Sequence, residues 1–80
     1  MIEAATEQRQ EIGVLGGLTR REIEVLCLLA DGLHTKAVAD RLGISFKTAA
    51  CHRYRILQKL GVETTVSAVR WAIRQGFVIP

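Results

Sequence analysis

Apolar residues recur every three or four positions in four stretches of the 80-residue chain, and a glycine follows each stretch. This spacing is typical of amphipathic helices that bury one face. It predicts helices over about 20–31, 36–42, 46–60 and 66–75. No alternation with a period of two residues persists, so we expect no β-sheet. The pattern therefore predicts an all-α fold, a four-helix bundle.

Residues that cap free backbone amides mark the start of each predicted helix. Thr19, with Glu22 three residues later, has the spacing of a capping box, in which each side chain accepts a hydrogen bond from the other residue's amide. The expected N-caps, in chain order, are Thr19, Thr35, Ser45 and either Thr64 or Thr65.

The second and third predicted helices form a helix-turn-helix over residues 35–54. Gly43 gives the backbone the freedom that a tight turn between two helices needs. Ala39 is small, so another helix can cross closely at that point. His52 falls on the inner face of the third helix. We expect it to be a core histidine bonded to backbone rather than a catalytic residue or a metal ligand.

Positive charge is concentrated on this helix-turn-helix. Residues 34–60 contain six Lys or Arg and one acidic residue, whereas residues 1–33 contain three and six. The whole chain has a net charge of only +3, so the distribution is more informative than the total. A cationic helix face is typical of a surface that binds a polyanion. The sequence therefore predicts binding to double-stranded DNA.

Several other classes of function are disfavoured by the sequence. Cys27 and Cys51 do not have the spacing of a zinc site. The chain shows no paired carboxylates, no nucleophile–base set and no phosphate-binding loop, so we expect no enzymatic activity. We likewise expect no cofactor, no metal and no small-molecule ligand in this domain. No segment is long and apolar enough to span a membrane, and no signal peptide is evident, so we expect a cytoplasmic protein without membrane contact.

The chain divides into two parts by composition. Residues 1–17 are polar and rich in glycine at their end, which predicts a linker or a flexible N-terminal segment. Residues 18–80 carry all four predicted helices and form the domain. A polar start of this kind suggests a piece of a longer protein, with a stand-alone protein of 80 residues as the alternative.

Many positions at fixed spacing resemble the LuxR-type (GerE/FixJ/NarL-like) DNA-binding domains. The resemblance covers about residues 18–78. The matching residues are Leu18-Thr19, Arg21-Glu22, Val25-Leu26, Leu29-Ala30, Gly32-Leu33, Lys36, Val38-Ala39, Arg41-Leu42-Gly43-Ile44-Ser45, Lys47-Thr48, His52, Ile56-Leu57, Lys59-Leu60-Gly61-Val62, Ala68, Ala72-Ile73 and Gly76.

This resemblance implies a tetrahelical output domain of a bacterial transcriptional regulator, such as a two-component response regulator. It implies that the third helix lies in the major groove of a promoter or operator, and that two copies pair through the fourth helix. RNA polymerase is a further possible partner. The sequence departs from the family at Ala49-Ala50, where Val-Lys is common. The base-contacting Lys of the family therefore cannot be assigned to Ala50.

The residues expected to contact DNA lie on the outer side of the helix-turn-helix. Nearest the bases we place Ala50, Cys51 and Tyr54, with Lys47 beside them. The expected phosphate contacts come from Thr35, Lys36, Ser45, Lys47, Thr48, Arg53, Arg55 and Lys59. The amides at the start of the third helix also favour an anion.

The last predicted helix carries more apolar residues than one short helix needs for its own core contact. The expected dimer interface consists of Val66, Val69, Arg70, Trp71 and Ile73. For Trp71 two partners remain open, the core of its own domain or a second copy. Two alternative functions also remain open: a sigma-factor-like helix-turn-helix, and a protein-interaction module that no longer binds DNA.

Overall fold

The computed structural model describes residues 16–76, in which four helices and no strand occur. The helices are α2 (Arg20–Ala30), α3 (Thr35–Leu42), α4 (Phe46–Leu60) and α5 (Thr65–Gln75). The predicted all-α fold with four helices is confirmed. The predicted linker, residues 1–17, lies outside the described range except for its last two glycines.

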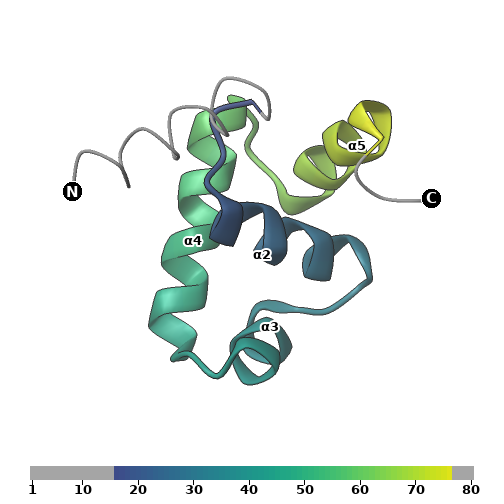
Figure 1. Ribbon diagram of the computed structural model, residues 1–80. Coiled ribbons are helices and arrows are strands. Elements are labelled where there is room, and N and C mark those ends of the chain that lie inside the picture. The colour runs from purple at the N-terminus through teal and green to yellow at the C-terminus, as the bar shows by residue number, and fades with distance from the viewer. Residues whose placement is uncertain (1–15, 77–80) are drawn as a thin grey trace.

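The first helix of the described range, α2, lies at the centre of the fold and contacts each of the other three helices. Figure 1 shows α2 crossing the long helix α4, with α3 on one side of α2 and α5 on the other. Both α3 and α5 also contact α4. The longest helix therefore contacts all three other helices, which lie on one side of it in Figure 1, and its other side is left uncovered by the described helices.

A single apolar core joins the four helices. Its completely buried members come from every helix and from the segment before α2; they are Leu18, Val25, Leu26, Val38, Ala49, Ile56, Ala68 and Ala72, each no more than 1% exposed. Burying side chains of the size of Leu or Ile contributes about 1.5–3 kcal/mol each relative to leaving them in water. Alanines at three of these positions let the helices approach closely.

Local capping chemistry sets most of the helix boundaries. The capping box of α2 is present: the Glu22 amide donates to Thr19 Oγ1 at 3.1 Å, and the Thr19 amide donates to Glu22 Oε1 at 2.9 Å. Ser45 caps α4 and Thr64 caps α5, as predicted. The first helix ends at Ala30 with Asp31 as its C-cap, slightly earlier than the spacing predicted.

The N-cap of α3 differs from the prediction. Thr35 is the first residue of the helix, and the cap is His34, whose Nδ1 accepts from the Ala37 amide at 3.3 Å. The imidazole takes this place because its unprotonated ring nitrogen is an acceptor three residues before a free amide. Histidine is not among the residues that usually cap helices, so the known N-cap preferences pointed to the neighbouring Thr35.

The turn between α3 and α4 is closed by backbone hydrogen bonds. Gly43 adopts a left-handed conformation with φ +69°, which a residue without Cβ reaches at little cost. The Ile44 amide donates to the Ala39 carbonyl at 3.0 Å, and the Gly43 amide donates to the Asp40 carbonyl at 3.3 Å. This pair of bonds is a Schellman motif, which ends α3 and directs the chain into α4. The helix-turn-helix is thus present.

Candidate nucleic-acid interface

The outer side of α4 carries the residues predicted to lie nearest the bases. Lys47, Cys51 and Tyr54 are spaced by four and three residues, so they lie along one line of the helix, and all three are exposed. Ala50 lies at the edge of this line and is half-buried. The structure therefore brings the four predicted base-reading residues together on one face.

Exposed apolar side chains are concentrated near this face. The large apolar side chains that stand exposed in residues 16–76 are Phe46 and Tyr54, both on α4, and Val66 on α5. Phe46 is the first residue of α4, next to Lys47. Sequence reasoning that looked for cations did not single out Phe46, whose exposure depends on the orientation of the first helical turn.

Four of the five predicted phosphate-binding cations occupy three different environments. Lys47 and Arg55 are exposed. Lys36 is exposed too, and its ammonium lies 3.8 Å from the Asp40 carboxylate one turn along α3. Arg53 is half-buried, and its Nε is enclosed without a hydrogen-bond partner. The stem of Arg53 therefore packs against the protein, while Lys47 and Arg55 extend into solvent.

The start of α4 presents backbone amides and two hydroxyl groups. Ser45 Oγ accepts from the Thr48 amide at 3.0 Å and donates to Thr48 Oγ1 at 3.0 Å. Both side chains are exposed. Thr35, at the start of α3, is half-buried. The partial positive charge of a helix N-terminus favours an anion beside the hydroxyls of Ser45 and Thr48.

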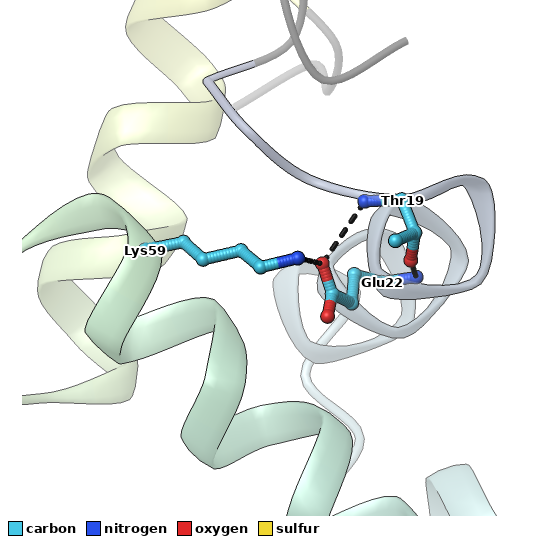
Figure 2. A network of polar contacts seen from close by, with 3 residues as sticks. All are labelled: Thr19, Glu22 and Lys59. Carbon is cyan, nitrogen blue, oxygen red and sulfur yellow. Dashed lines mark hydrogen bonds and ion pairs between the residues drawn. The ribbon is translucent and has the colours of Figure 1, made fainter. Parts of the chain in front are cut away.

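Lys59 has a different environment from the other predicted phosphate contacts. Its ammonium donates to Glu22 Oε1 at 2.8 Å, and Glu22 is only 3% exposed. Figure 2 shows that the same carboxylate oxygen also accepts the Thr19 amide, so one atom joins the start of α2 to the last turn of α4. Lys59 is therefore committed to an internal ion pair that orients α4.

The environment of His52 corrects one detail of the sequence interpretation. The ring is partly buried on the inner side of α4, as predicted, but its Nδ1 is enclosed without any hydrogen-bond partner. The expected bond to backbone is therefore not made by this nitrogen. No donor or acceptor of the described residues lies within hydrogen-bonding reach of this nitrogen.

A polar pair on α4 was missed by the sequence analysis. The Gln58 side-chain amide donates from Nε2 to Tyr54 Oη at 3.0 Å, and both side chains are exposed. The signal for Gln58 was present in the spacing, because it continues the line of Lys47, Cys51 and Tyr54 by four more residues. A search for cations passes over a neutral glutamine.

The two cysteines lie in contrasting environments and neither forms a disulfide. Cys51 is exposed on the outer face of α4. Cys27 lies in α2, and partial burial, with a smaller contribution from the Asp31 carboxylate, raises the pKa of its thiol above the ordinary value of 9.0. Within residues 16–76 no group of three or more His, Cys, Asp or Glu side chains is placed to hold a metal ion.

The residues predicted to form a dimer interface separate into two groups on α5. Val66, Arg70 and Ile73 are spaced by four and three residues and share one line of the helix. Val66 is 61% exposed, Arg70 is exposed and Ile73 is half-buried. Val69 and Trp71 instead pack against the core of their own domain.

The contact of Trp71 with the chain before α2 is close. Gly16 has φ +70°, and a Cβ built on it would lie 2.6 Å from Cζ2 of the indole and 3.4 Å from Cδ2 of Leu60. Real side chains essentially never approach this closely, so the indole occupies the space that a side chain at position 16 would need. The structure thus gives Trp71 a partner within its own domain.

Comparison with known proteins identifies the family to which these features correspond. Residues 17–72 match the family described as "Bacterial regulatory proteins, luxR family". This range begins before α2 and ends within α5, so it includes the complete helix-turn-helix.

No helix within residues 16–76 has both the length and the apolar character needed to cross a membrane.

Individual relatives are regulatory proteins that are longer than this chain. It is 35% identical over 74 residues to "Transcriptional regulatory protein TdiR" of Thauera aromatica, which covers 92% of this chain and 33% of that protein. It is 41% identical over 61 residues (76% and 29%) to "Transcriptional regulatory protein LiaR" of Bacillus subtilis. It is 36% identical over 58 residues (72% and 27%) to "Oxygen regulatory protein NreC" of Staphylococcus aureus. The chain spans about a third or less of the length of these relatives.

Proposed function

Because this chain belongs to the luxR family of bacterial regulatory proteins, we propose that it binds a specific double-stranded DNA sequence as the output domain of a transcriptional regulator. The observation that carries the proposal is the outer face of α4, where Lys47, Cys51, Tyr54 and Arg55 stand exposed on a helix whose opposite side is buried. An α-helix presented in this way fits the major groove, where base edges distinguish all four base pairs.

The proposed contacts separate into those that position the domain and those that read sequence. Arg53, Arg55, Lys36 and Lys47 supply positive charge for phosphates, and the hydroxyls of Thr35, Ser45 and Thr48 with the amides at the start of α4 supply hydrogen-bond donors. Ala50, Cys51 and Tyr54 face the bases. Ala50 offers only a methyl group, which suits the C5-methyl of thymine.

Lys59 receives a different role in this proposal. Because its ammonium is held by the buried Glu22, it sets the orientation of α4 relative to α2 rather than contacting a phosphate directly. The helix then presents its outer face in a fixed orientation, which sequence-specific hydrogen bonds require.

We further propose that two copies pair through the exposed line of α5, Val66, Arg70 and Ile73. The support for this pairing is that Val66 is 61% exposed on the same line of α5 as the exposed Arg70 and the half-buried Ile73. Pairing through this line would place two copies of α4 about 34 Å apart, one turn of DNA. One short helix buries little area, so the isolated chain is expected to dimerise weakly.

Transcriptional output implies RNA polymerase as a further protein partner and the cytoplasm as the place of action. The luxR-family match replaces the alternative of a sigma-factor-like helix-turn-helix. The remaining alternative is a protein-interaction module that does not bind DNA. It is favoured by Ala50, which stands where Lys is common in the family, and the experiment below distinguishes it from the proposed function. The family is one of regulatory proteins, and the proposed function requires no enzymatic step.

The deciding experiment is selection of bound duplexes from a random pool, followed by a salt titration on the selected duplex. We expect enrichment of a limited set of sequences. Affinity should fall by roughly 0.9 log units per log unit of salt for each neutralised phosphate. Binding that does not depend on salt, or no binding to any duplex, would favour the interaction module.

A further inference from the structure

We infer that Gln58 is a specificity-positioning residue, which holds the Tyr54 hydroxyl as a hydrogen-bond donor toward a base edge. The inference rests on the proposed DNA binding of α4 and deepens it. The observation behind it is the hydrogen bond from Gln58 Nε2 to Tyr54 Oη at 3.0 Å on the exposed side of the helix.

The position of Gln58 places it with the residues proposed to read DNA. Counting along α4, Lys47, Cys51, Tyr54 and Gln58 are separated by four, three and four residues. These separations keep all four side chains along one line of an α-helix. The opposite line contains the buried Ala49 and Ile56. Gln58 therefore belongs to the outer face by geometry, although it carries no charge.

The direction of the hydrogen bond determines what Tyr54 can offer. A phenolic hydroxyl has one hydrogen to donate and lone pairs that accept. Because the Gln58 amide occupies a lone pair, the hydroxyl hydrogen stays available for a third atom outside the protein. The pair can then donate to an acceptor on a base edge, while the Gln58 oxygen and its second amide hydrogen remain free to bond.

Base edges in the major groove supply the matching acceptors. Guanine presents N7 and O6, adenine presents N7 and thymine presents O4, whereas cytosine presents an amino donor. An oriented hydroxyl donor favours the first three edges over the fourth. A tyrosine ring without the Gln58 bond keeps its hydroxyl but loses the constraint on its direction. Gln58 therefore acts on sequence preference through Tyr54.

Within residues 16–76 this is the only hydrogen bond that either side chain makes, and it joins neighbouring turns of a single helix. An exposed contact between neighbouring turns contributes little to folding. Changes at these two positions can therefore be made without removing the core contacts of α4. This makes the role of the pair separable from the stability of the domain.

The test uses Gln58→Met, which removes the amide and keeps the length and helix preference of the side chain. Tyr54→Phe removes only the hydroxyl, and the double variant completes the set. Gln75→Met, an exposed glutamine near the end of α5, is the matched control. Each variant of the full chain undergoes selection from the same random pool, and affinities are measured on the wild-type duplex and on duplexes with single base changes.

We expect Gln58→Met and Tyr54→Phe to lose discrimination at the same base pair, by roughly three- to tenfold each, the range of one net hydrogen bond. The double variant should lose no more than Tyr54→Phe alone, because Gln58 acts only through the Tyr54 hydroxyl. The Gln75→Met control should keep the wild-type preference. A uniform loss of affinity on all duplexes would assign Tyr54 to a phosphate and overturn the inference.

Two further outcomes separate the failure of this inference from the failure of DNA binding. If wild-type protein enriches a sequence and Gln58→Met enriches the same one equally well, only the role of Gln58 is overturned. If wild-type protein enriches nothing, the proposed function fails and the inference fails with it. In the free protein, the NMR signals of the Gln58 side-chain amide should shift in Tyr54→Phe while those of Gln75 stay; no shift at Gln58 would overturn the hydrogen bond itself.

Discussion

The two faces of α4 differ in what holds their side chains. On the inner face Ala49 and Ile56 are completely buried, and Lys59 is tied to Glu22 on another helix. On the outer face Tyr54 is 58% exposed, and its hydrogen-bond partner belongs to the same helix. The inner residues are thus determined by the fold, whereas the outer residues have no comparable packing reason for their identity.

Under the proposed function, this difference would let one scaffold recognise different DNA sequences. Substitutions on the inner face alter packing with α2, so they change stability first. Substitutions on the outer face leave the core intact, so they change recognition first. The departure of Ala49-Ala50 from the common Val-Lys of the family crosses this division, because Ala49 lies inside and Ala50 lies at the outer edge.

The largest effect is expected from truncating the inner face. Ile56→Ala should lower the free energy of unfolding by about 2–5 kcal/mol, because it removes buried methyl groups and leaves a cavity. Chemical denaturation followed by circular dichroism measures this loss. The neighbouring Arg55→Ala should change stability by no more than about 0.5 kcal/mol. Equal losses for these adjacent substitutions would contradict the division between faces.

The next effect concerns two lysines on the same helix. Lys59→Met should lower the free energy of unfolding by about 1–3 kcal/mol, because it leaves Glu22 buried without its cation. This loss is smaller than for a fully buried ion pair, since a third of the Lys59 side chain is exposed. Lys47→Met should leave stability unchanged. It should make the slope of log DNA affinity against log salt concentration shallower by about 0.9, the contribution of one neutralised phosphate. A loss of salt dependence in Lys59→Met as large as in Lys47→Met would instead place Lys59 on a phosphate.

A smaller effect is expected from restoring the common residue of the family at the outer edge. Ala50→Lys adds a cation facing the groove, so it should strengthen DNA binding by about 1 kcal/mol and alter the preferred sequence. Duplex selection and affinity measurements at fixed salt check both expectations. An unchanged preference together with unchanged affinity would show that position 50 does not face the DNA.

The smallest effect compares the two cysteines. The exposed Cys51 should react with a thiol reagent faster than Cys27, because burial raises the pKa of the Cys27 thiol.

A raised pKa of Cys27 in the folded state favours the protonated thiol. The contribution of this group to stability is therefore complete below the ordinary value of 9.0 and is lost as the pH rises above it. Thermal unfolding from pH 8 upward tests this sign, with Cys27→Ala as the variant that lacks the loss. Equal labelling rates of the two cysteines would contradict the difference in their environments. A stability that rises with pH above 9.0 would contradict the raised pKa of Cys27.

Local rules were sufficient to predict the helices and the turn. Thr19 with Glu22, Ser45, and Gly43 each act within a few residues of chain, so their effect is visible in the sequence. His34 was missed although it also acts locally, because its capping depends on the ring nitrogen facing the Ala37 amide rather than on a common preference.

Contacts between distant parts of the chain could not be predicted in the same way. The Lys59–Glu22 pair joins residues 37 positions apart, so neither residue's own surroundings in the sequence reveal it. The partner of Trp71 depended on where the chain before α2 passes, and the spacing along α5 alone left it open. The outer line of α4 was predictable from spacing, but the partner of Tyr54 was overlooked because Gln58 is neutral.

The single oxygen of Glu22 that accepts from both Thr19 and Lys59 has a consequence for local opening of the domain. Fraying of the first turn of α2 and release of the last turn of α4 become one event, since moving the carboxylate breaks both bonds together. Amides in these two turns should therefore exchange their hydrogens with solvent at matched opening free energies. We therefore expect the ends of these two helices to open as one cooperative unit.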